Sequence, residues 1–327
     1  MQTMRRVLAV LAILALAGIA DGQTRSSMFV FQNNFWLNLH QFMRGEVYRR
    51  GAKLPPGLDP ASLGEADRAR WTAAVDAYVD VATHNLLDPW SEQTQNTLGG
   101  LNDVAVLPDG ALEPAVATAL NNAAPIYRAL LWPARRRDND AWIASAKALV
   151  TRHETAMAAT LANAYHVTWP RDPYLVDAVG EIGANSGVTH GGPAGFAARI
   201  QAGAASPRNT GDAPLELIFH EASHTLSVGG RISAMIAEES ARQKLTVPDE
   251  LWHFMIMFTT GALARRELAN TGRPGYASYD DRYHQIPPAE RSAFERDWQP
   301  YLDGKAPFEQ ALHDLVRDAR AATVTPR

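Results

Sequence analysis

The pentapeptide His220-Glu221-Ala222-Ser223-His224 constrains the fold of this 327-residue chain more than any other stretch. On an α-helix, residues four apart lie on one face, so His220 and His224 can reach the same metal ion. Imidazole is a good zinc ligand, and Glu221 can stand beside a zinc-bound water molecule without being a ligand itself. The spacing therefore predicts a zinc site built on one helix.

The residues before this motif indicate that its helix is buried. Asp212 is a good N-cap and Pro214 follows in the first turn, so we expect the helix to begin there. The apolar residues that lead directly to His220 are Leu215, Leu217, Ile218 and Phe219. Because unpaired polar groups are costly in a buried helix, the histidines need partners, which a metal supplies. We expect this helix to continue past His224 and to end near the Gly229-Gly230 pair.

A second buried helix is predicted where the chain is apolar on almost every side, from Leu251 to Leu263. Thr246 and Asp249 form the pattern of a capping box in front of it. Catalytic zinc sites usually have three protein ligands, and His253 lies inside this apolar stretch. We therefore expect His253 to be the third metal ligand.

Glu250 is the alternative third ligand, because a carboxylate also binds zinc. Glu250 and His253 are one turn apart, so one can bind the metal while the other orients a ligand. Glu238 and Glu239 are further alternatives, on a more polar helix expected over residues 232–245.

If a zinc-bound water attacks a peptide bond at this site, a donor for the developing oxyanion is also needed. The stretch from Arg273 to Tyr283 reads as a loop that can fold over the cleft. Tyr276 and Tyr279 are the candidate catalytic donors in it, with Tyr283 and His284 as further possibilities.

The first 20 residues have the pattern of a secretory signal peptide. Arg5 and Arg6 precede the apolar run from Val7 to Ala17, and cleavage is expected after Ala20. This predicts a secreted or periplasmic protein, with no integral membrane segment after cleavage, since the run is short for a membrane span. An uncleaved N-terminal anchor is the alternative.

Composition narrows the remaining choices. The chain has no cysteine, so disulfides and thiolate ligands are excluded, and zinc must be held by histidine and carboxylate. The formal net charge of -4 is too mild to suggest nucleic acid as a partner.

The pattern along the chain predicts an α+β fold that is predominantly helical, with a small sheet before the motif. We expect a helical N-terminal region over 21–165 and a metal-binding region over 166–327, forming one compact unit. His40 is expected to be a hydrogen-bonded core histidine. His190, beside two glycines, is expected to be an ordinary loop histidine, with a functional residue facing a cleft as the alternative. The predicted helices are Ser26–Arg50, Glu65–Leu86, Leu112–Leu131, Asn139–His166 and Pro307–Ala322, and the predicted strands are Tyr174–Val179, Gly187–His190 and Phe196–Gln201.

His220, Glu221 and His224 on a helix after a small sheet resemble the zincin superfamily of metallopeptidases. The resemblance implies that the histidines bind zinc, that Glu221 is the general base, and that a downstream helix gives the third ligand. It also implies an edge strand that pairs with the substrate backbone, here Gly187–His190 or Phe196–Gln201. The chain has Ser227 and Gly230 where the metzincin branch needs Gly and His, and Glu238-Glu239 does not match the thermolysin-type signature.

The function predicted from these residues is zinc-dependent peptide hydrolysis, in which Glu221 activates a metal-bound water to attack a peptide or protein substrate. Two alternatives stay open. One is a non-catalytic binding protein on a zincin scaffold, and the other is a metal-dependent hydrolase of a different amide bond.

Overall fold

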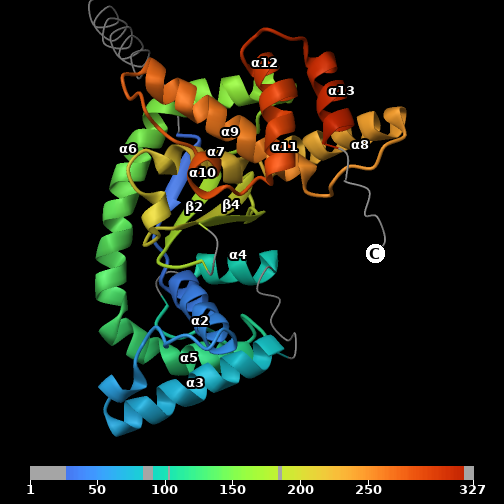
Figure 1. The fold of residues 1–327 in the computed structure, drawn as a ribbon. Coiled ribbons are helices and arrows are strands. Elements are labelled where there is room, and N and C mark those ends of the chain that lie inside the picture. The colour runs from blue at the N-terminus through green and yellow to red at the C-terminus, as the bar shows by residue number, and fades with distance from the viewer. Residues whose placement is uncertain (1–26, 84–90, 102–103, 183–185, 320–327) are drawn as a thin grey trace, which may run out of the picture.

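The computed structural model describes residues 27–83, 91–101, 104–182 and 186–319 (Figure 1). The fold is α+β and mostly helical, with one small mixed sheet, in agreement with the predicted class. The expected signal peptide, residues 1–20, lies outside the described residues, as does the predicted end of the second helix after Thr83. Within the described residues, every helix is too short or too polar to cross a membrane.

The sheet has four strands in the order β1-β2-β4-β3. Strand β2 (Tyr174–Val179) pairs in parallel with both β1 (Phe29–Gln32) and β4 (Ala198–Gly203), while β3 (Gly187–Gly191) pairs antiparallel with β4 at the edge. The prediction for β2 is confirmed, and β3 is one residue longer than predicted. Strand β4 begins two residues later than predicted, because Phe196 closes a turn by donating its N–H to the Pro193 carbonyl.

The prediction of one helix over Ser26–Arg50 is wrong at its start. Residues Phe29–Gln32 form β1, and the helix α2 (Phe35–Gly51) begins only after Asn34, whose side chain accepts a hydrogen bond from the Leu37 N–H. Phe29 pairs with Tyr174 of β2, and their rings stack with centroids 5.3 Å apart. Pairing of β1 with β2, a strand far along the chain, therefore decides the structure of these residues, although their apolar spacing is helical.

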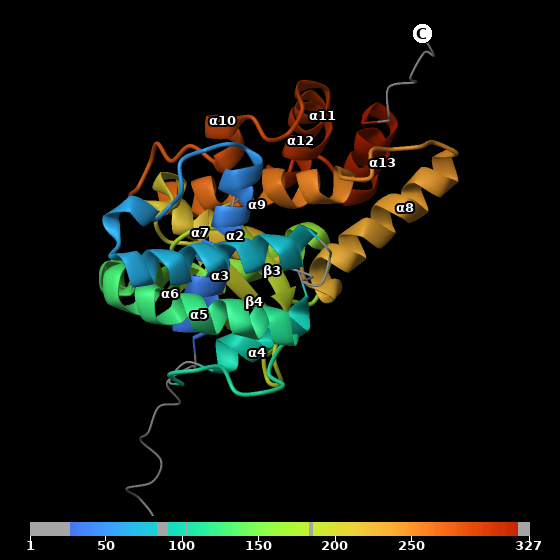
Figure 2. The ribbon, with the colours of Figure 1, turned by 90° about the horizontal axis from the view of Figure 1, so that it is seen from below.

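One face of the sheet is covered by helices that precede β2. Besides α2 they include α3 (Glu65–Thr83), α4 (Glu92–Gly100) and α5 (Pro114–Leu130), seen below the sheet in Figure 1 and in front of it in Figure 2. Helix α4 was not predicted, because its last two residues, Gly99 and Gly100, read as a break. The 34-residue helix α6 (Trp132–Tyr165) begins earlier than the predicted Asn139 and runs alongside both layers.

The helices that follow β4 lie on the other side of the sheet, and α7 (Ala213–Ala222) is the one that packs directly on it. The others are α8 (Arg231–Gln243), α9 (Leu251–Asn270), α10 (Tyr279–Tyr283), α11 (Pro288–Ala293), α12 (Gln299–Leu302) and α13 (Phe308–Asp318), with π-helical turns at Leu226–Gly230 and Phe294–Trp298. Helix α10 lies inside the stretch predicted to be a loop, and Ser278 with Asp281 forms its capping box. The capping box predicted at Thr246 and Asp249 does not form, because α9 starts at Leu251 without a side-chain cap.

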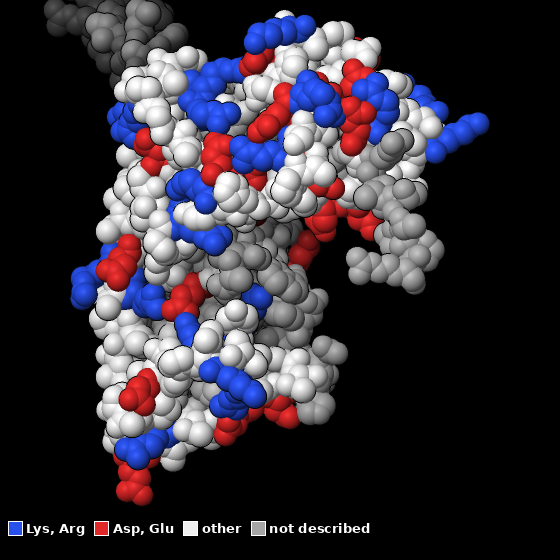
Figure 3. Space-filling view, in the orientation of Figure 1, with Lys and Arg blue, Asp and Glu red and all other residues white. Residues whose placement is uncertain are grey.

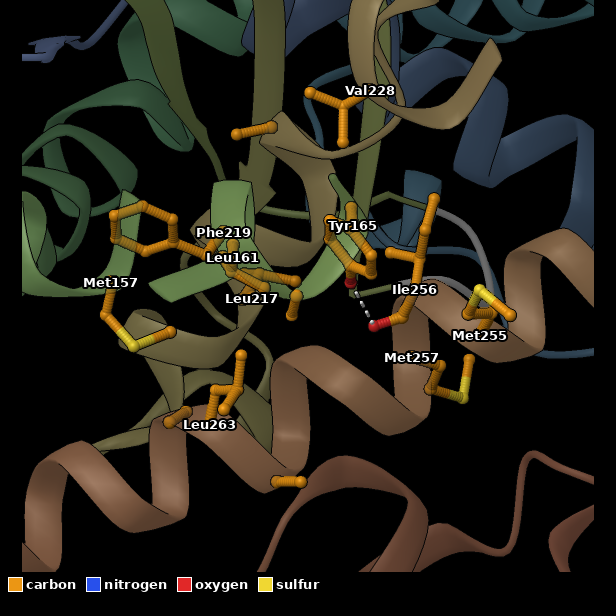
Figure 4. Close-up of a cluster of buried hydrophobic side chains, with 14 of the residues drawn as sticks. Met157, Leu161, Tyr165, Leu217, Phe219, Val228, Met255, Ile256, Met257 and Leu263 are labelled. Atoms are coloured by element: carbon orange, nitrogen blue, oxygen red, sulfur yellow. Dashed lines mark hydrogen bonds between the residues drawn. The ribbon is translucent and has the colours of Figure 1, made fainter. Parts of the chain in front are cut away.

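Helix α6 contributes to the apolar core on the same side as α7. Met157, Leu161 and Tyr165 of α6 pack there with Leu217 and Phe219 of α7 and with residues of α9 (Figure 4). The Tyr165 hydroxyl donates to the Ile256 carbonyl across this core, at 3.4 Å. The two regions predicted over 21–165 and 166–327 therefore share this core.

Acidic and basic side chains of the described residues are interspersed over the face of the molecule in Figure 3. The same view shows the surface hollowed between α8 above and the level of α4 below.

Candidate metal centre

Helix α7 is held rigidly by burial. Its residues Leu215, Ile218 and Phe219 are 0% exposed, between the sheet on one side and helices α6 and α9 on the other. Asp212 stands before the helix as predicted, but its side chain makes no cap hydrogen bond and instead pairs with Arg273. The start of α7 is therefore fixed by Pro214 and by packing, and His220 enters the site from a buried scaffold.

The prediction that α7 continues past His224 is wrong, because the helix ends at Ala222. A tighter turn follows, in which the His224 N–H donates to the Glu221 carbonyl at 3.1 Å. The Ser223 hydroxyl donates to the Phe219 carbonyl at 2.8 Å and fixes this turn. The turn keeps His224 beside His220, with their Nε2 atoms 3.1 Å apart.

His253 of α9 completes a group of three histidines. Its Nε2 atom lies 3.2 Å from the Nε2 atom of His220, and one nitrogen from each of the three rings lies within 4.8 Å of the others. Zinc–nitrogen bonds of about 2.0–2.1 Å at tetrahedral angles place two ligand nitrogens about 3.3 Å apart. The spacing of His220, His224 and His253 therefore fits a zinc ion.

Burial favours the neutral form of the three imidazoles. Burial, with the neighbouring rings of His224 and His253, lowers the pKa of His220 well below its usual value. Burial, and then His253, lowers the pKa of His224 to about 4. Burial also lowers the pKa of His253, although Glu250 opposes this shift. Neutral imidazoles offer the lone pairs that a metal needs.

The carboxylates considered as alternative ligands lie elsewhere. Glu250 is exposed, and its Oε2 atom is 3.6 Å from Nδ1 of His253, on the far side of that ring from the cluster. Glu238 pairs with Arg231 at 3.4 Å, and Glu239 accepts hydrogen bonds from Gln243 and His313. Glu250 is thus within ion-pair distance of His253 but outside the cluster, Glu238 is exposed on α8, and Glu239 bonds α8 to His313 of α13.

Glu221 is buried beside the histidines, with 6% of its surface exposed. Burial raises the pKa of its carboxyl to about 7, against the opposing effect of a hydrogen bond from Thr189. The Thr189 hydroxyl on β3 lies 2.7 Å from Oε2 of Glu221. A Cβ atom added to Gly187 would lie 2.8 Å from Oε1 of Glu221, so the glycine lets the edge strand pass close to the carboxylate. The sequence pattern does not mark Thr189 as a partner of Glu221.

The tyrosines proposed as oxyanion donors use their hydroxyls elsewhere. Tyr279 lines the cavity in front of the histidines, but its hydroxyl donates to Oδ1 of Asn209 at 2.6 Å. The Tyr276 hydroxyl donates to Oε2 of Glu216 at 2.7 Å. The Tyr283 ring packs under the guanidinium of Arg208, and His284 ends α10 with a positive φ of 50°. Of the four candidates, the structure brings Tyr279 to the cavity.

Glu216 is a second buried carboxylate that sequence reasoning missed. It lies one turn before His220, and it accepts hydrogen bonds from the Tyr276 hydroxyl and the Tyr279 N–H. Burial raises the pKa of its carboxyl to about 7. These bonds join α10 to α7. The signal was available, because an acidic residue between Leu215 and Leu217 of an apolar helix needs a partner.

The cavity in front of the cluster has a volume of about 280 Å³. Its wall combines His220, Glu221, His224 and His253 with apolar side chains of three elements, namely Val188, Leu217 and Met257. This combination of a few polar groups with an apolar wall is typical of a small ligand site.

The two histidines discussed outside the cluster lie on the opposite side of the sheet. His40 is fully buried, with Nδ1 2.5 Å from the Tyr78 hydroxyl and Nε2 3.2 Å from Nε2 of Gln95, so it is the hydrogen-bonded core histidine that was predicted. His190 is buried on strand β3, not in a loop.

No protein-family model matches this chain, and neither a curated protein nor a solved structure matches it. The residues that indicate a function are therefore the three clustered histidines and Glu221.

Proposed function

We propose that this protein is a zinc-dependent peptide hydrolase of zincin-like architecture. The observation that carries the proposal is the convergence of three imidazoles, with Nε2 of His220 3.1 Å from that of His224 and 3.2 Å from that of His253, beside the buried carboxylate of Glu221. A structural metal site has no need of such a carboxylate, whereas hydrolysis needs a base next to the attacking water. His220, His224 and His253 would hold the zinc, and Glu250 would orient His253.

A bound zinc ion would supply Lewis-acid activation of water and of the scissile carbonyl. The protein's own side chains carry out the proton transfers. Glu221 accepts a proton from the attacking water and passes it to the leaving amine, for which a pKa near 7 is well suited. The Thr189 hydroxyl fixes the direction of the Glu221 carboxylate through its 2.7 Å hydrogen bond.

Strand β3 supports a peptide as the substrate. It is an edge strand that runs past the histidines and supplies Gly187, Val188 and Thr189 to the wall of the cavity. An extended peptide can add to such an edge through backbone hydrogen bonds, and the apolar cavity beside it can hold one side chain. Export through the predicted signal peptide would place this activity outside the cytoplasm.

The test combines metal analysis with turnover. Purified mature protein should contain one zinc per chain and should hydrolyse a mixture of unmodified peptides. Glu221→Gln should keep the zinc and lose turnover, because the amide cannot accept the proton. Full turnover by Glu221→Gln would refute the mechanism. Bound zinc with no hydrolysis of any peptide by the wild-type protein would favour a non-catalytic binding protein or a hydrolase of another amide bond.

A further inference from the structure

Two cavities meet at His224, one of the three clustered histidines. A second cavity of about 640 Å³ shares Thr189 and His224 with the first and continues along β3 in the opposite direction. Its wall comes from Glu92 of α4, from residues 170–172 and from the turn at residues 225–227. The cleft along β3 therefore has two arms, and the second arm ends at α4, which lies below the sheet in Figure 1.

The outer edge of β3 is open in one arm and occupied in the other. The Gly203 N–H donates to the Ser186 carbonyl at 2.9 Å, so by the alternation of an antiparallel ladder Gly187, Thr189 and Gly191 direct their backbone groups outward. In the described part of the chain, no bond from another segment reaches the backbone of Gly187 or Thr189. At Gly191, however, the N–H donates to Oε1 of Glu92 at 3.0 Å, and the carbonyl accepts from Nδ2 of Asn96 at 3.1 Å.

Helix α4 is fixed in this position by a buried ion pair. Oδ1 of Asn96 accepts from Nε of Arg199 at 3.0 Å, and Nη1 of Arg199 donates to Oδ2 of Asp177 at 2.7 Å. The Arg199 and Asp177 side chains are 2% and 0% exposed. Gly99 lies directly on the guanidinium, since an added Cβ would be 1.9 Å from Nη1. Moving α4 away would uncover this ion pair, so the helix is a fixed end to the cleft.

The length of the closed arm limits the substrate. An extended chain rises about 3.4 Å per residue, so about 7 Å of strand separate Thr189, at the candidate site, from Gly191. Because Gly191 has no free backbone group, a paired substrate has room for only one or two residues in this arm. A long polypeptide cannot continue past α4 along the strand.

The charge at the closed end selects one end of a peptide. Glu92 bonds Gly191 with Oε1, and its side chain is exposed in the cavity wall, so Oε2 can receive a ligand. Arg171 and Asp172, which also line this arm, offset each other in charge. A carboxylate at the end of the groove attracts an ammonium group and repels a carboxylate.

We propose that this cleft binds the free amino terminus of a peptide at Glu92, and that the protein removes one or two residues from that end. The proposal rests on the proposed function, whose site it extends. It requires the substrate to run antiparallel to β3, with its amino terminus at Gly191 and the remainder of its chain in the arm beside Leu217 and Met257.

The experiment compares one peptide of about eight residues in three forms: unmodified, N-acetylated, and C-amidated, with products identified by mass spectrometry. Release of one or two residues from the amino end of the unmodified and amidated forms is expected, with at least tenfold slower cleavage of the acetylated form. Equal internal cleavage of the acetylated form, or loss of cleavage on amidation, would overturn the inference. If none of the three forms is cleaved, the proposed function fails, and this inference with it.

Glu92→Gln tests the assigned contact. The amide oxygen can still accept from the Gly191 N–H, so the fold is retained while the charge is lost. KM for the unmodified peptide should rise about tenfold or more, and the preference over the acetylated form should shrink. Glu238→Gln is the matched control, because this carboxylate is exposed on α8 and pairs with Arg231. An unchanged preference in Glu92→Gln would remove Glu92 from the proposal.

Discussion

The Thr189 hydroxyl on the edge strand lies 2.7 Å from Oε2 of Glu221 on α7. This hydrogen bond joins the strand proposed to bind substrate to the residue proposed to move the proton. The Thr189 hydroxyl oxygen also lies 2.8 Å from the backbone carbonyl oxygen of Glu221. The hydroxyl is therefore in hydrogen-bond contact with both the backbone and the carboxylate of Glu221. If a substrate pairs with β3 as proposed, its binding and the direction of the Glu221 carboxylate would be coupled through the Thr189 side chain.

Replacing Thr189 by Val should lower kcat about 10- to 100-fold with little change in KM, because it removes the support of Glu221 and keeps the side-chain shape. Thr189→Ser restores the hydroxyl and should restore most of the activity. Zinc content, measured by elemental analysis, should be the same in both variants. If Thr189→Ser lost as much activity as Thr189→Val, the methyl group of Thr189, and not its hydroxyl, would be the part that matters.

Gly187→Ala should lower kcat more than it changes stability. The added Cβ would lie 2.8 Å from Oε1 of Glu221 and 2.9 Å from Cδ1 of Leu217, so the carboxylate must move. We expect a loss of at least tenfold in turnover and a thermal midpoint within a few degrees of the wild type. Gly100→Ala, where an added Cβ meets nothing within 4 Å, is the control and should leave turnover unchanged.

The sequence predicted the helices and strands whose patterns are local. The run Tyr174–Val179 reads as a strand and is one, and His253 stands out because a polar residue inside an apolar helix needs a partner. Strand β1 was missed because its alignment with β2 depends on residues far along the chain. The end of α7 at Ala222 could not be predicted, because no glycine or proline lies there and the first glycines that follow are Gly229 and Gly230.

The residues of the candidate site could be predicted where their sequence pattern is unusual, and could not where the residue type is common in its element. A histidine pair at helical spacing is unusual, so His220 and His224 could be selected directly. Threonine is ordinary in a strand, and only its position opposite Glu221 gives Thr189 a role. The hydroxyl partners of Tyr276 and Tyr279 could not be inferred, because Glu216 and Asn209 lie 60 and 70 residues earlier in the chain.

His253→Ala and Glu250→Ala should separate the third ligand from the residue that orients it. His253→Ala removes a ligand, so zinc should be lost on dialysis against a weak chelator. Glu250→Ala leaves the three imidazoles in place and should weaken zinc binding by about tenfold or less, because its carboxylate is exposed and 3.6 Å from Nδ1. Chelator competition measures both. Retention of zinc by His253→Ala together with its loss in Glu250→Ala would reverse the two roles.

Glu216 should make the protein less stable as the pH rises. Burial raises the pKa of its carboxyl from 4.5 to about 7 in the folded protein, so the folded state holds its proton more tightly than the unfolded state. The stabilisation is therefore fully present below about pH 4.5 and is lost as the pH rises towards 7, by about 3 kcal/mol in total.

Glu216→Gln isolates this contribution, because the amide stays neutral and its oxygen can accept from the Tyr276 hydroxyl and the Tyr279 N–H. The free energy of unfolding of the variant minus that of the wild type, from urea titrations, should increase between pH 5 and pH 7.5 and then level off. Glu238→Gln, on an exposed side chain, should give a constant difference over the same range. A constant difference for Glu216→Gln would mean that Glu216 does not hold its proton more tightly in the folded state.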